Sequence, residues 1–347
     1  MKITKKSYPS PKGEIDIYTL TNASGASVDL STLGAGIKAV RVPDAEGKIE
    51  NVALSYENPA DYIADGPCAG KIPGRFANRI ANACFTLDGV EYHLAANCSG
   101  GNALHGGPEG FQNQIWKARE TADGVIFSYH SADGEEGYPG NLDVEAEYKW
   151  SDDNVLSLHI TARTDKATVI NLTNHAYWNL SGADAGSILD HKIRMKASHW
   201  LPTSSELIPT GEIASVEGTP MDFRLIKEIG RDIKADFDAL KFGKGYDNCW
   251  VIDREAPGIT EAIELIDDKS GRTLTVSSDQ PAFQVYTGNW LAGSPKNMSG
   301  RSYEDYDGVA IEMQGMPDAP NKPQFPGAVL RPGETYDRTI RFAFSTE

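Results

Sequence analysis

The chain has 347 residues, of which 40% are hydrophobic, and it carries a formal net charge of −16. This length and apolar content are ample for a globular core. The negative charge disfavours nucleic acids and anionic membrane surfaces as partners, since binding to either depends on Lys and Arg contacts to phosphates. We therefore expect a neutral small molecule as the partner, although a local basic pocket could still hold a phosphorylated one.

The first ten residues contain three lysines but no apolar run after them, so we expect neither a secretory signal nor a membrane anchor. No stretch approaches the roughly 20 apolar residues of a membrane-spanning helix. The four cysteines show no CxxC spacing and no His/Cys cluster, so we expect no metal site. Reduced thiols and the lack of a signal favour a cytoplasmic location.

Alternating apolar and polar residues predict antiparallel strands along most of the chain. Asp88-Gly89 separates residues 85–87 from residues 90–94, which is the signature of a hairpin with a type I′ turn. Residues 142–150, 156–163 and 339–344 each alternate with period two, as strands with one buried face do.

Helical spacing is confined to a few places. A short helical turn is predicted near residues 59–64, and a second set of apolar positions has the spacing of one helical face. That set consists of Leu225, Ile229, Ile233, Phe237 and Leu240. No βαβ rhythm, internal repeat or long linker is visible. We therefore predict one all-β domain over residues 1–347, a large antiparallel β-sandwich with a few short helices.

Two strand-like segments each carry one ionisable residue among apolar neighbours. In residues 171–178 the alternation places His175 and Tyr177 on one polar face. In residues 309–314 it places Glu312 opposite an apolar face that would pack into a core. An acid and a base on rigid strands suggest proton-transfer catalysis, although most strand histidines and glutamates are ordinary solvated or hydrogen-bonded residues.

Four further segments are candidates for binding a polar ligand, and each has a plain structural alternative. The residues concerned are Asn78 and Arg79 in a loop, His105 among four glycines, Asp247 before a strand and Gln284 within one. The alternatives are a salt-bridged loop, a tight connection, a turn aspartate and a buried core amide. No Walker A, GxGxxG, HExxH or GxSxG pattern is present, so nucleotide, zinc-protease and serine-hydrolase functions lose their usual support.

Taken in order, these segments resemble the aldose 1-epimerase (galactose mutarotase) family along nearly the whole chain. The matching stretches are Asn78-Arg79, 104–107, 171–177, Tyr246-Asp247, 284–289, Glu312 and Pro317-Asp318. The resemblance implies a β-supersandwich and an isomerase that interconverts the α and β anomers of free aldohexoses such as D-glucose and D-galactose. It implies no metal or organic cofactor, and it leaves a monomer or a homodimer open.

The resemblance also implies roles for individual residues. Glu312 matches the general base and His175 the general acid, and His105 belongs with them at the catalytic centre. The positions that hold sugar hydroxyls or assist the acid are matched by Asn78, Arg79, His105, Tyr177, Asp247 and Gln284. Asn248 departs from the pattern, in which a histidine commonly follows the aspartate, and this leaves the setting of Asp247 open.

Opening a cyclic hemiacetal requires removal of the proton on the C1 hydroxyl and delivery of a proton to the ring oxygen. A carboxylate and an imidazolium meet that need, so we expect a nearby carboxylate to raise the pKa of His175. Three other functions compete with this interpretation. Asp247 and Glu312 could form the carboxylate pair of a glycoside hydrolase. The chain could also act on hexose 6-phosphates, or be a sugar-binding module without catalysis.

Overall fold

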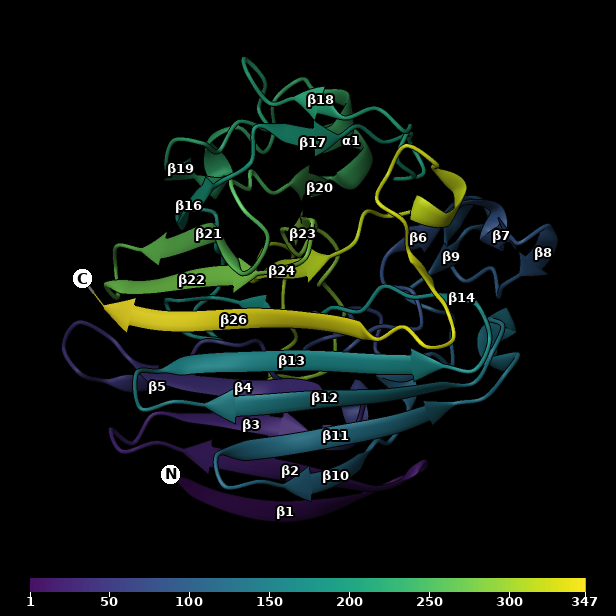
Figure 1. Ribbon diagram of the computed structural model, residues 1–347. Coiled ribbons are helices and arrows are strands. Elements are labelled where there is room, and N and C mark those ends of the chain that lie inside the picture. The colour runs from purple at the N-terminus through teal and green to yellow at the C-terminus, as the bar shows by residue number, and fades with distance from the viewer. Residues whose placement is uncertain (347) are drawn as a thin grey trace.

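The computed structural model describes residues 1–346, and nearly all of its regular structure is β-strand (Figure 1). Three large antiparallel sheets contain most of the strands. The N-terminal part of the chain forms a five-stranded meander in chain order, made of β1 (Lys2–Ser10), β2 (Gly13–Thr21), β3 (Ser27–Ser31), β4 (Gly36–Pro43) and β5 (Ile49–Asn51).

The largest sheet has nine strands and combines the middle of the chain with its C-terminal part. In sheet order it contains β10 (Lys117–Glu120), β11 (Gly124–Ser131), β12 (Leu142–Trp150), β13 (Val155–Thr164), β26 (Tyr336–Thr346), β22 (Arg272–Ser278), β21 (Thr260–Asp267), β16 (Lys192–Met195) and β19 (Lys227–Glu228). The C-terminal strand β26 therefore lies in the middle of this sheet, between strands from two separate parts of the sequence (Figure 1).

The third sheet has six strands and, as shown below, carries much of the candidate site. In sheet order it contains β15 (Tyr177–Trp178), β24 (Val309–Gln314), β23 (Ala282–Tyr286), β20 (Asp247–Val251), β17 (His199–Leu201) and β18 (Ala214–Ser215). Three small pairs complete the strands, namely β6 (Arg79–Ile80) with β9 (Ala103–Leu104), β7 (Cys84–Leu87) with β8 (Val90–His93), and β14 (Thr168–Val169) with β25 (Val329–Leu330).

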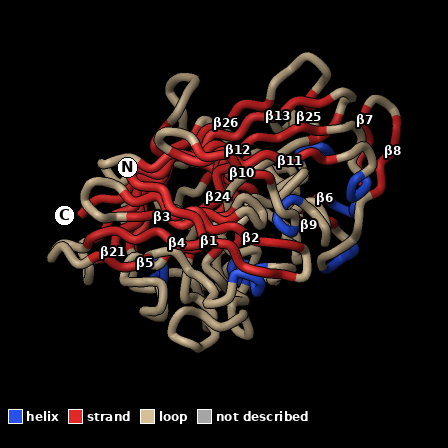
Figure 2. Tube along the Cα trace, turned by 90° about the horizontal axis from the view of Figure 1, so that it is seen from below, coloured by secondary structure: helices blue, strands red, loops and turns tan. Residues whose placement is uncertain are grey.

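The nine-stranded sheet packs against both of the other large sheets. Tyr18 of β2 meets Phe127 of β11 with ring centroids 6.2 Å apart, and Trp178 of β15 meets Phe342 of β26 at 5.2 Å. Figure 2 shows these two sheets as stacked layers, with β10–β12 drawn above β1–β4. The five- and six-stranded sheets are joined where the amide of Leu54 donates to the carbonyl of Tyr177 at 2.9 Å. The main apolar core lies between the nine-stranded sheet and the other two large sheets.

The predicted strands 142–150, 156–163 and 339–344 are confirmed, as parts of β12, β13 and β26. The hairpin is confirmed as β7–β8, and both turn residues have the positive φ that a type I′ turn requires, 51° at Asp88 and 81° at Gly89. The turn at residues 59–64 is the 3-10 helix η1 (Pro59–Tyr62). An all-β sandwich with short helices is thus the observed fold class.

The helix suggested by the apolar spacing between residues 225 and 240 is wrong. Only the 3-10 turn η6 (Ile229–Arg231) and the six-residue α1 (Asp238–Gly243) form there, while β19 pairs with β16. Leu225 is 84% exposed, whereas Ile229 and Leu240 are buried. These apolar side chains therefore do not share one helical face, and their spacing is coincidental. The other short 3-10 turns are η2 (Ala81–Ala83), η3 (Ser99–Gly101), η4 (Phe111–Asn113), η5 (Glu135–Gly137) and η7 (Ala319–Asn321).

Candidate active site

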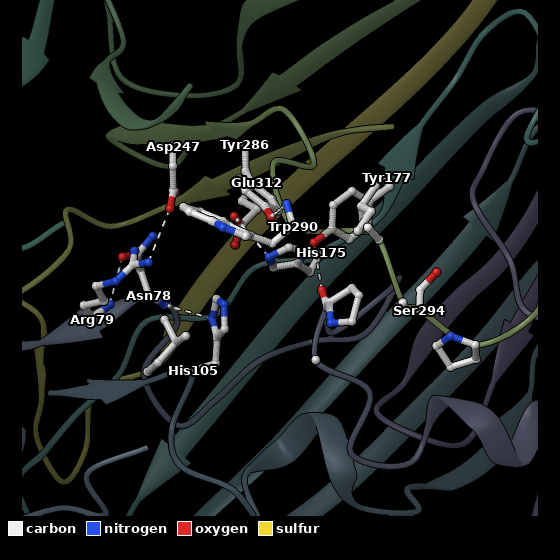
Figure 3. Close-up of a pocket in the computed structure, with 17 residues that line it drawn as sticks. Asn78, Arg79, His105, His175, Tyr177, Asp247, Tyr286, Trp290, Ser294 and Glu312 are labelled. Carbon is white, nitrogen blue, oxygen red and sulfur yellow. Dashed lines mark hydrogen bonds and ion pairs between the residues drawn. The ribbon is translucent and has the colours of Figure 1, made fainter. Parts of the chain in front are cut away.

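The structure brings seven of the eight predicted site residues together around one cavity of about 420 Å³ (Figure 3). These seven are Asn78, Arg79, His105, His175, Tyr177, Asp247 and Glu312. Gln284 does not line the cavity but contacts Asp247 from within the sheet. The volume is in the range typical of small-ligand sites.

Strand register explains why Glu312, Gln284 and Asp247 converge. Glu312 of β24 lies directly opposite Gln284 of β23, and Asp247 of β20 lies opposite Tyr286, two positions further along β23. Opposed residues and residues two apart share one face of a sheet, so all four side chains project to the same side. The alternation predicted for residues 309–314 is confirmed, although β24 is buried on both faces.

His175 reaches the same place from an irregular segment, and its predicted position on a strand is wrong. Strand β15 begins only at Tyr177, and residues 171–176 make isolated long-range bonds instead of a ladder. The amide of His175 donates to the carbonyl of Lys71, and the amide of Gly70 donates to the carbonyl of His175, both at 2.9 Å. Gly70 has φ +73°, and a Cβ there would lie 1.9 Å from the carbonyl oxygen of Ile37, so only glycine suits this close approach.

The imidazole and the carboxylate face each other in the floor of the cavity. Nε2 of His175 lies 3.4 Å from Oε1 of Glu312, and the side chains are 5% and 2% exposed. Nδ1 of His175 and Oε2 of Glu312 are buried and have no hydrogen-bond partner among the described residues. Such atoms are costly when left unsatisfied, so their presence beside a cavity favours a ligand that carries hydroxyl groups.

Burial dominates the electrostatics of this pair. It lowers the pKa of His175 to about 4, although the negative charge of Asp247 opposes this shift. It raises the pKa of Glu312 well above its ordinary value, and repulsion from Asp247 adds to that rise. The expectation that a carboxylate would raise the pKa of His175 is therefore wrong, because desolvation of the imidazole outweighs the attraction. Each group favours its neutral form in the free protein, so we place the proton of the pair on Glu312.

His105 approaches the cavity from the connection that follows β9, and its protonation follows from its contacts. The amide of Asn78 donates to Nδ1 of His105 at 3.2 Å, which leaves the ring proton on Nε2. Burial, and next the positive charge that His175 can carry, hold the pKa of His105 well below its ordinary value. Its ring lies edge-on to His175 with centroids 5.2 Å apart. His105 is therefore a neutral hydrogen-bond donor beside the acid–base pair.

Strand β6, which carries Arg79, is held by Asp318, whose amide donates to the carbonyl of Arg79 at 2.9 Å. The guanidinium of Arg79 contacts Oδ2 of Asp247 at 3.3 Å, and the amide group of Gln284 donates to Oδ1 at 2.7 Å. Asp247 is thus fixed by a cation on one oxygen and an amide on the other. The side-chain oxygen of Asn248 accepts from the backbone amide of Asp247 at 3.3 Å, but its side-chain nitrogen is buried without a partner among the described residues, and the structure gives no reason for an asparagine at this position.

Aromatic side chains form one wall of the cavity (Figure 3). Tyr177 packs against His175 with centroids 5.1 Å apart, and its hydroxyl donates to the carbonyl of Pro67 at 2.9 Å. Trp290 stacks on Tyr286 at 6.4 Å and is 50% exposed at the rim. Sequence reasoning missed Trp290 and the loop that follows it. The only sequence signal was a tryptophan just after the Gly288-Asn289 turn, and a tryptophan more often marks a core.

The rest of the described chain gives two further findings. No group of three or more His, Cys, Asp or Glu side chains within residues 1–346 is arranged to hold a metal ion. No helix in that range is long and apolar enough to cross a membrane.

The fold and the site together define a β-sandwich protein in which a buried histidine and a buried glutamate face each other at a cavity lined by polar and aromatic side chains. Comparison with known proteins gives the family. The aldose 1-epimerase family model matches residues 16–343, and the chain belongs to this family. It is 42% identical to galactose mutarotase from Bos taurus over 97% of this chain and 96% of that protein. It is 40% identical to the galactose mutarotase of Homo sapiens over the same shares.

Solved structures agree with this assignment. An aldose epimerase homologue from C. elegans superposes with a TM-score of 0.88 at 30% identity, covering 99% of each chain. The resemblance noted in the sequence is therefore confirmed, both in family and in fold.

Proposed function

We propose that this protein is an aldose 1-epimerase that interconverts the α and β anomers of free aldohexoses, with His175 and Glu312 as its acid and base. The observation that carries the proposal is the distance of 3.4 Å between Nε2 of His175 and Oε1 of Glu312 in the floor of a solvent-accessible cavity. Family membership, and the mutarotase names of relatives at 40% identity or more, support the same reaction.

The reaction needs two coordinated proton transfers. Glu312 removes the proton of the C1 hydroxyl while His175 delivers a proton to the ring oxygen, so that the C1–O5 bond breaks and a C1 carbonyl forms. Rotation about C1–C2 then presents the opposite face of the carbonyl to the C5 hydroxyl. The ring closes as the two protons return along the same routes, which yields the other anomer. Each positioned proton transfer typically contributes about 10²–10⁴-fold in rate.

Sugar binding prepares the pair for this chemistry. The free protein favours a protonated Glu312 beside a neutral His175, whereas the reaction requires the carboxylate and the imidazolium. These two forms are tautomers that differ by one proton moved across 3.4 Å. A C1 hydroxyl that donates to Glu312 stabilises the carboxylate and so favours the reactive tautomer. A base whose pKa is raised toward neutrality is also a stronger proton acceptor.

The remaining predicted residues are assigned to holding the sugar. Asp247 offers carboxylate oxygens to hydroxyl groups, with Gln284 behind it. Arg79 and the Nε2–H of neutral His105 offer donors, and Arg79 also stabilises negative charge that develops on oxygen. Asn78 shapes the loop, since its φ of 65° is supported by its own side-chain bond to the Arg79 amide at 2.8 Å. Tyr177 packs against the acid and helps to orient it.

Charge at the cavity favours a neutral sugar over a hexose 6-phosphate. Arg79 is the one Lys or Arg among the described residues that line the cavity, and it is already paired with Asp247. A phosphate would be held by a cluster of such groups. The glycoside hydrolase alternative is also weaker, because the matching family model and the relatives at 40% identity or more carry epimerase and mutarotase names. A non-catalytic binding module has no use for a matched acid and base.

Polarimetry of freshly dissolved α-D-glucose and α-D-galactose at neutral pH tests the proposal. We expect wild-type protein to accelerate mutarotation of at least one sugar, and no release of aglycone from an aryl glycoside, which lacks a free C1 hydroxyl. No acceleration over buffer with either sugar, together with turnover of glucose 6-phosphate, would replace the free aldose by its phosphate. Aglycone release would indicate a hydrolase.

Three broader expectations accompany this proposal. Residues 1–347 act as one domain, supported by a core cluster that draws on all three large sheets. The location is cytoplasmic, supported by four free cysteines. The partner is a free aldose. The chain is a monomer or a homodimer, and a sedimentation experiment would distinguish these two states.

A further inference from the structure

A fully buried ion pair lies behind His175, outside the cavity. The side chains of Asp65 and Lys71 are 0% and 1% exposed, and the Lys71 ammonium donates to the Asp65 carboxylate. Neither group takes part in the proton transfers proposed above. Burying two charges costs the folded state several kcal/mol per ion before their attraction and hydrogen bonds offset it. Stability alone is therefore a weak explanation for the pair.

The hydrogen bonds around the pair are complete. Besides Asp65, the Lys71 ammonium donates to the carbonyl of Tyr62 and to Oδ1 of Asn113, so its three donors are all used. The second oxygen of Asp65 accepts from the hydroxyl of Tyr56 at 3.0 Å and from a backbone amide at 2.9 Å. A network this fully satisfied fixes its members in one arrangement and leaves no free group to bind a ligand.

The pair joins the two ends of a short loop, residues 65–71, which we call the clasp. Its middle touches the cavity, where the carbonyl of Pro67 accepts the hydroxyl of Tyr177 at 2.9 Å. Its end holds the backbone of His175 through the amide of Gly70 and the carbonyl of Lys71. The two aromatic residues that the clasp holds lie side by side in Figure 3. The clasp thus contacts the acid itself and the ring packed against it.

We propose that the Asp65–Lys71 ion pair is a positioning device for catalysis, which closes the clasp and so fixes His175 and Tyr177 against the sugar. This inference rests on the proposed epimerase function. Apart from Tyr177, whose assigned part is to orient the acid, the groups assigned to hold the sugar are carried by other elements. Arg79 lies on β6, Asp247 on β20 and His105 after β9. Loosening the clasp should therefore impair the chemical step and leave substrate binding nearly unchanged.

The Lys71 charge also acts on His175 directly, because it lowers the pKa of that imidazole. Other titratable groups face His175 from every element packed against it. They are Glu312 from β24, Asp247 from β20, Tyr286 from β23, Tyr177 from β15 and His105 from the connection after β9. Replacing Lys71 alone removes the positive charge that lowers the pKa of His175, so this pKa should rise.

Three variants and one control test the inference by steady-state polarimetry, with rates expressed per folded molecule. Lys71→Met removes the cation, and Asp65→Asn combined with Lys71→Met removes both buried charges so that neither is left unpaired. Tyr56→Phe keeps the pair and removes one support of Asp65. The control, Lys227→Met, breaks another ion pair with a buried lysine. Its ammonium lies 2.8 Å from the half-buried Asp232 at the edge of the nine-stranded sheet.

We expect kcat to fall about 10- to 100-fold in the first two variants, because misplacing a catalytic group by about 1 Å has an effect of that size. KM should stay within about twofold, and Tyr56→Phe should show a smaller fall in kcat of the same kind. In Lys71→Met the acidic limb of kcat/KM against pH should move to higher pH. Lys227→Met should lose stability and keep the wild-type kcat.

Two results would overturn the inference. One is a normal kcat, KM and pH profile in the folded double variant and in Tyr56→Phe, which would make the pair purely structural. The other is a raised KM with an unchanged kcat. If Lys71→Met does not fold, the double variant and Tyr56→Phe still decide. Failure of the wild-type protein to act on any aldose would count against the proposed function and is seen before any variant is made.

Discussion

Replacing Glu312 by Gln should abolish most activity and at the same time stabilise the fold. Loss of a positioned base typically costs about 10²–10⁴-fold, or about 2.7–5.4 kcal/mol of transition-state stabilisation. The amide keeps the shape of the side chain and its place on β24 opposite Gln284. We therefore expect a folded protein whose mutarotation rate approaches that of buffer, measured by polarimetry with α-D-glucose and α-D-galactose.

The stability gain follows from the pKa of Glu312, which burial raises well above its ordinary value of 4.5. Between 4.5 and that raised pKa the folded state binds more protons than the unfolded state, so wild-type stability falls as the pH rises through this window. Each unit of displacement costs the folded state about 1.36 kcal/mol once the pH exceeds the raised value. The uncharged amide of Glu312→Gln would carry no such cost. The variant should therefore gain over wild type as pH rises, and a gain of about 1 kcal/mol corresponds to roughly 2 °C in Tm.

Urea unfolding of the variant and wild type at pH 4.5 and pH 7.5 measures this difference, with Glu145→Gln on the exposed face of β12 as the matched control. The control should change stability by less than about 0.5 kcal/mol and leave the rate unaltered. Retention of half or more of the wild-type rate by Glu312→Gln would refute its assignment as the base. A variant less stable than wild type at pH 7.5 would refute the argument from burial.

Three further predictions concern the surroundings of the base. Because the folded-state pKa of His175 is about 4, against about 6.5 when unfolded, wild type should lose roughly 3 kcal/mol as pH falls through that window. The stability of His175→Asn should not fall in this way. If urea unfolding shows the same loss of stability with falling pH in the variant and in wild type, the prediction is wrong. Gln284→Leu removes a 2.7 Å bond to Asp247, so KM should rise about tenfold with kcat nearly unchanged in steady-state polarimetry, and an unchanged KM would speak against Asp247 as a sugar ligand. Gly70→Ala places a Cβ 1.9 Å from a carbonyl and should cost more than about 3 kcal/mol, whereas Gly89→Ala, at φ +81° in open space, should cost about 1 kcal/mol in the same urea assay.

Strands with one buried face were predictable because their alternation reports burial directly. In β12 every second residue from Leu142 to Trp150 is buried, and the residues between them are exposed or half-buried. Strand β24 was predicted for a weaker reason. All six of its residues are buried, so its alternation reflects the chemistry of the site face and not contact with solvent.

The irregular backbone of residues 171–176 could not be predicted from their sequence pattern. Its alternation resembles that of a strand, but its bonding partners are spread along residues 70–77, with Asn171 bonded to Arg75 and Ala77, and His175 to Gly70 and Lys71. No local sequence rule indicates such irregular long-range pairing. The candidate residues could nevertheless be named, because their residue types are visible in sequence and the family resemblance implied roles for them.

The residues behind the site were invisible for a different reason. Asp65 and Lys71 are six residues apart in a loop rich in Gly and Pro, and such charges normally mark solvated surface. Only the closure of the loop against Tyr56 and Asn113 buries them. The same limit applies to the pKa of His175, since the sequence indicates a carboxylate nearby but not how completely water is excluded.

Exclusion of water shifts the pKa of both His175 and Glu312. It lowers the pKa of His175 and raises that of Glu312, so the free protein holds the pair in the tautomer that cannot start the reaction as proposed. A sugar that donates its C1 hydroxyl to Glu312 and accepts at its ring oxygen supplies the hydrogen bonds that reverse this preference. Only a ligand with both groups in the right places would do so, and a glycoside lacks the first. In this proposal a free aldose is required because it carries the C1 hydroxyl, and the burial that shifts both pKa values is also what costs the fold stability.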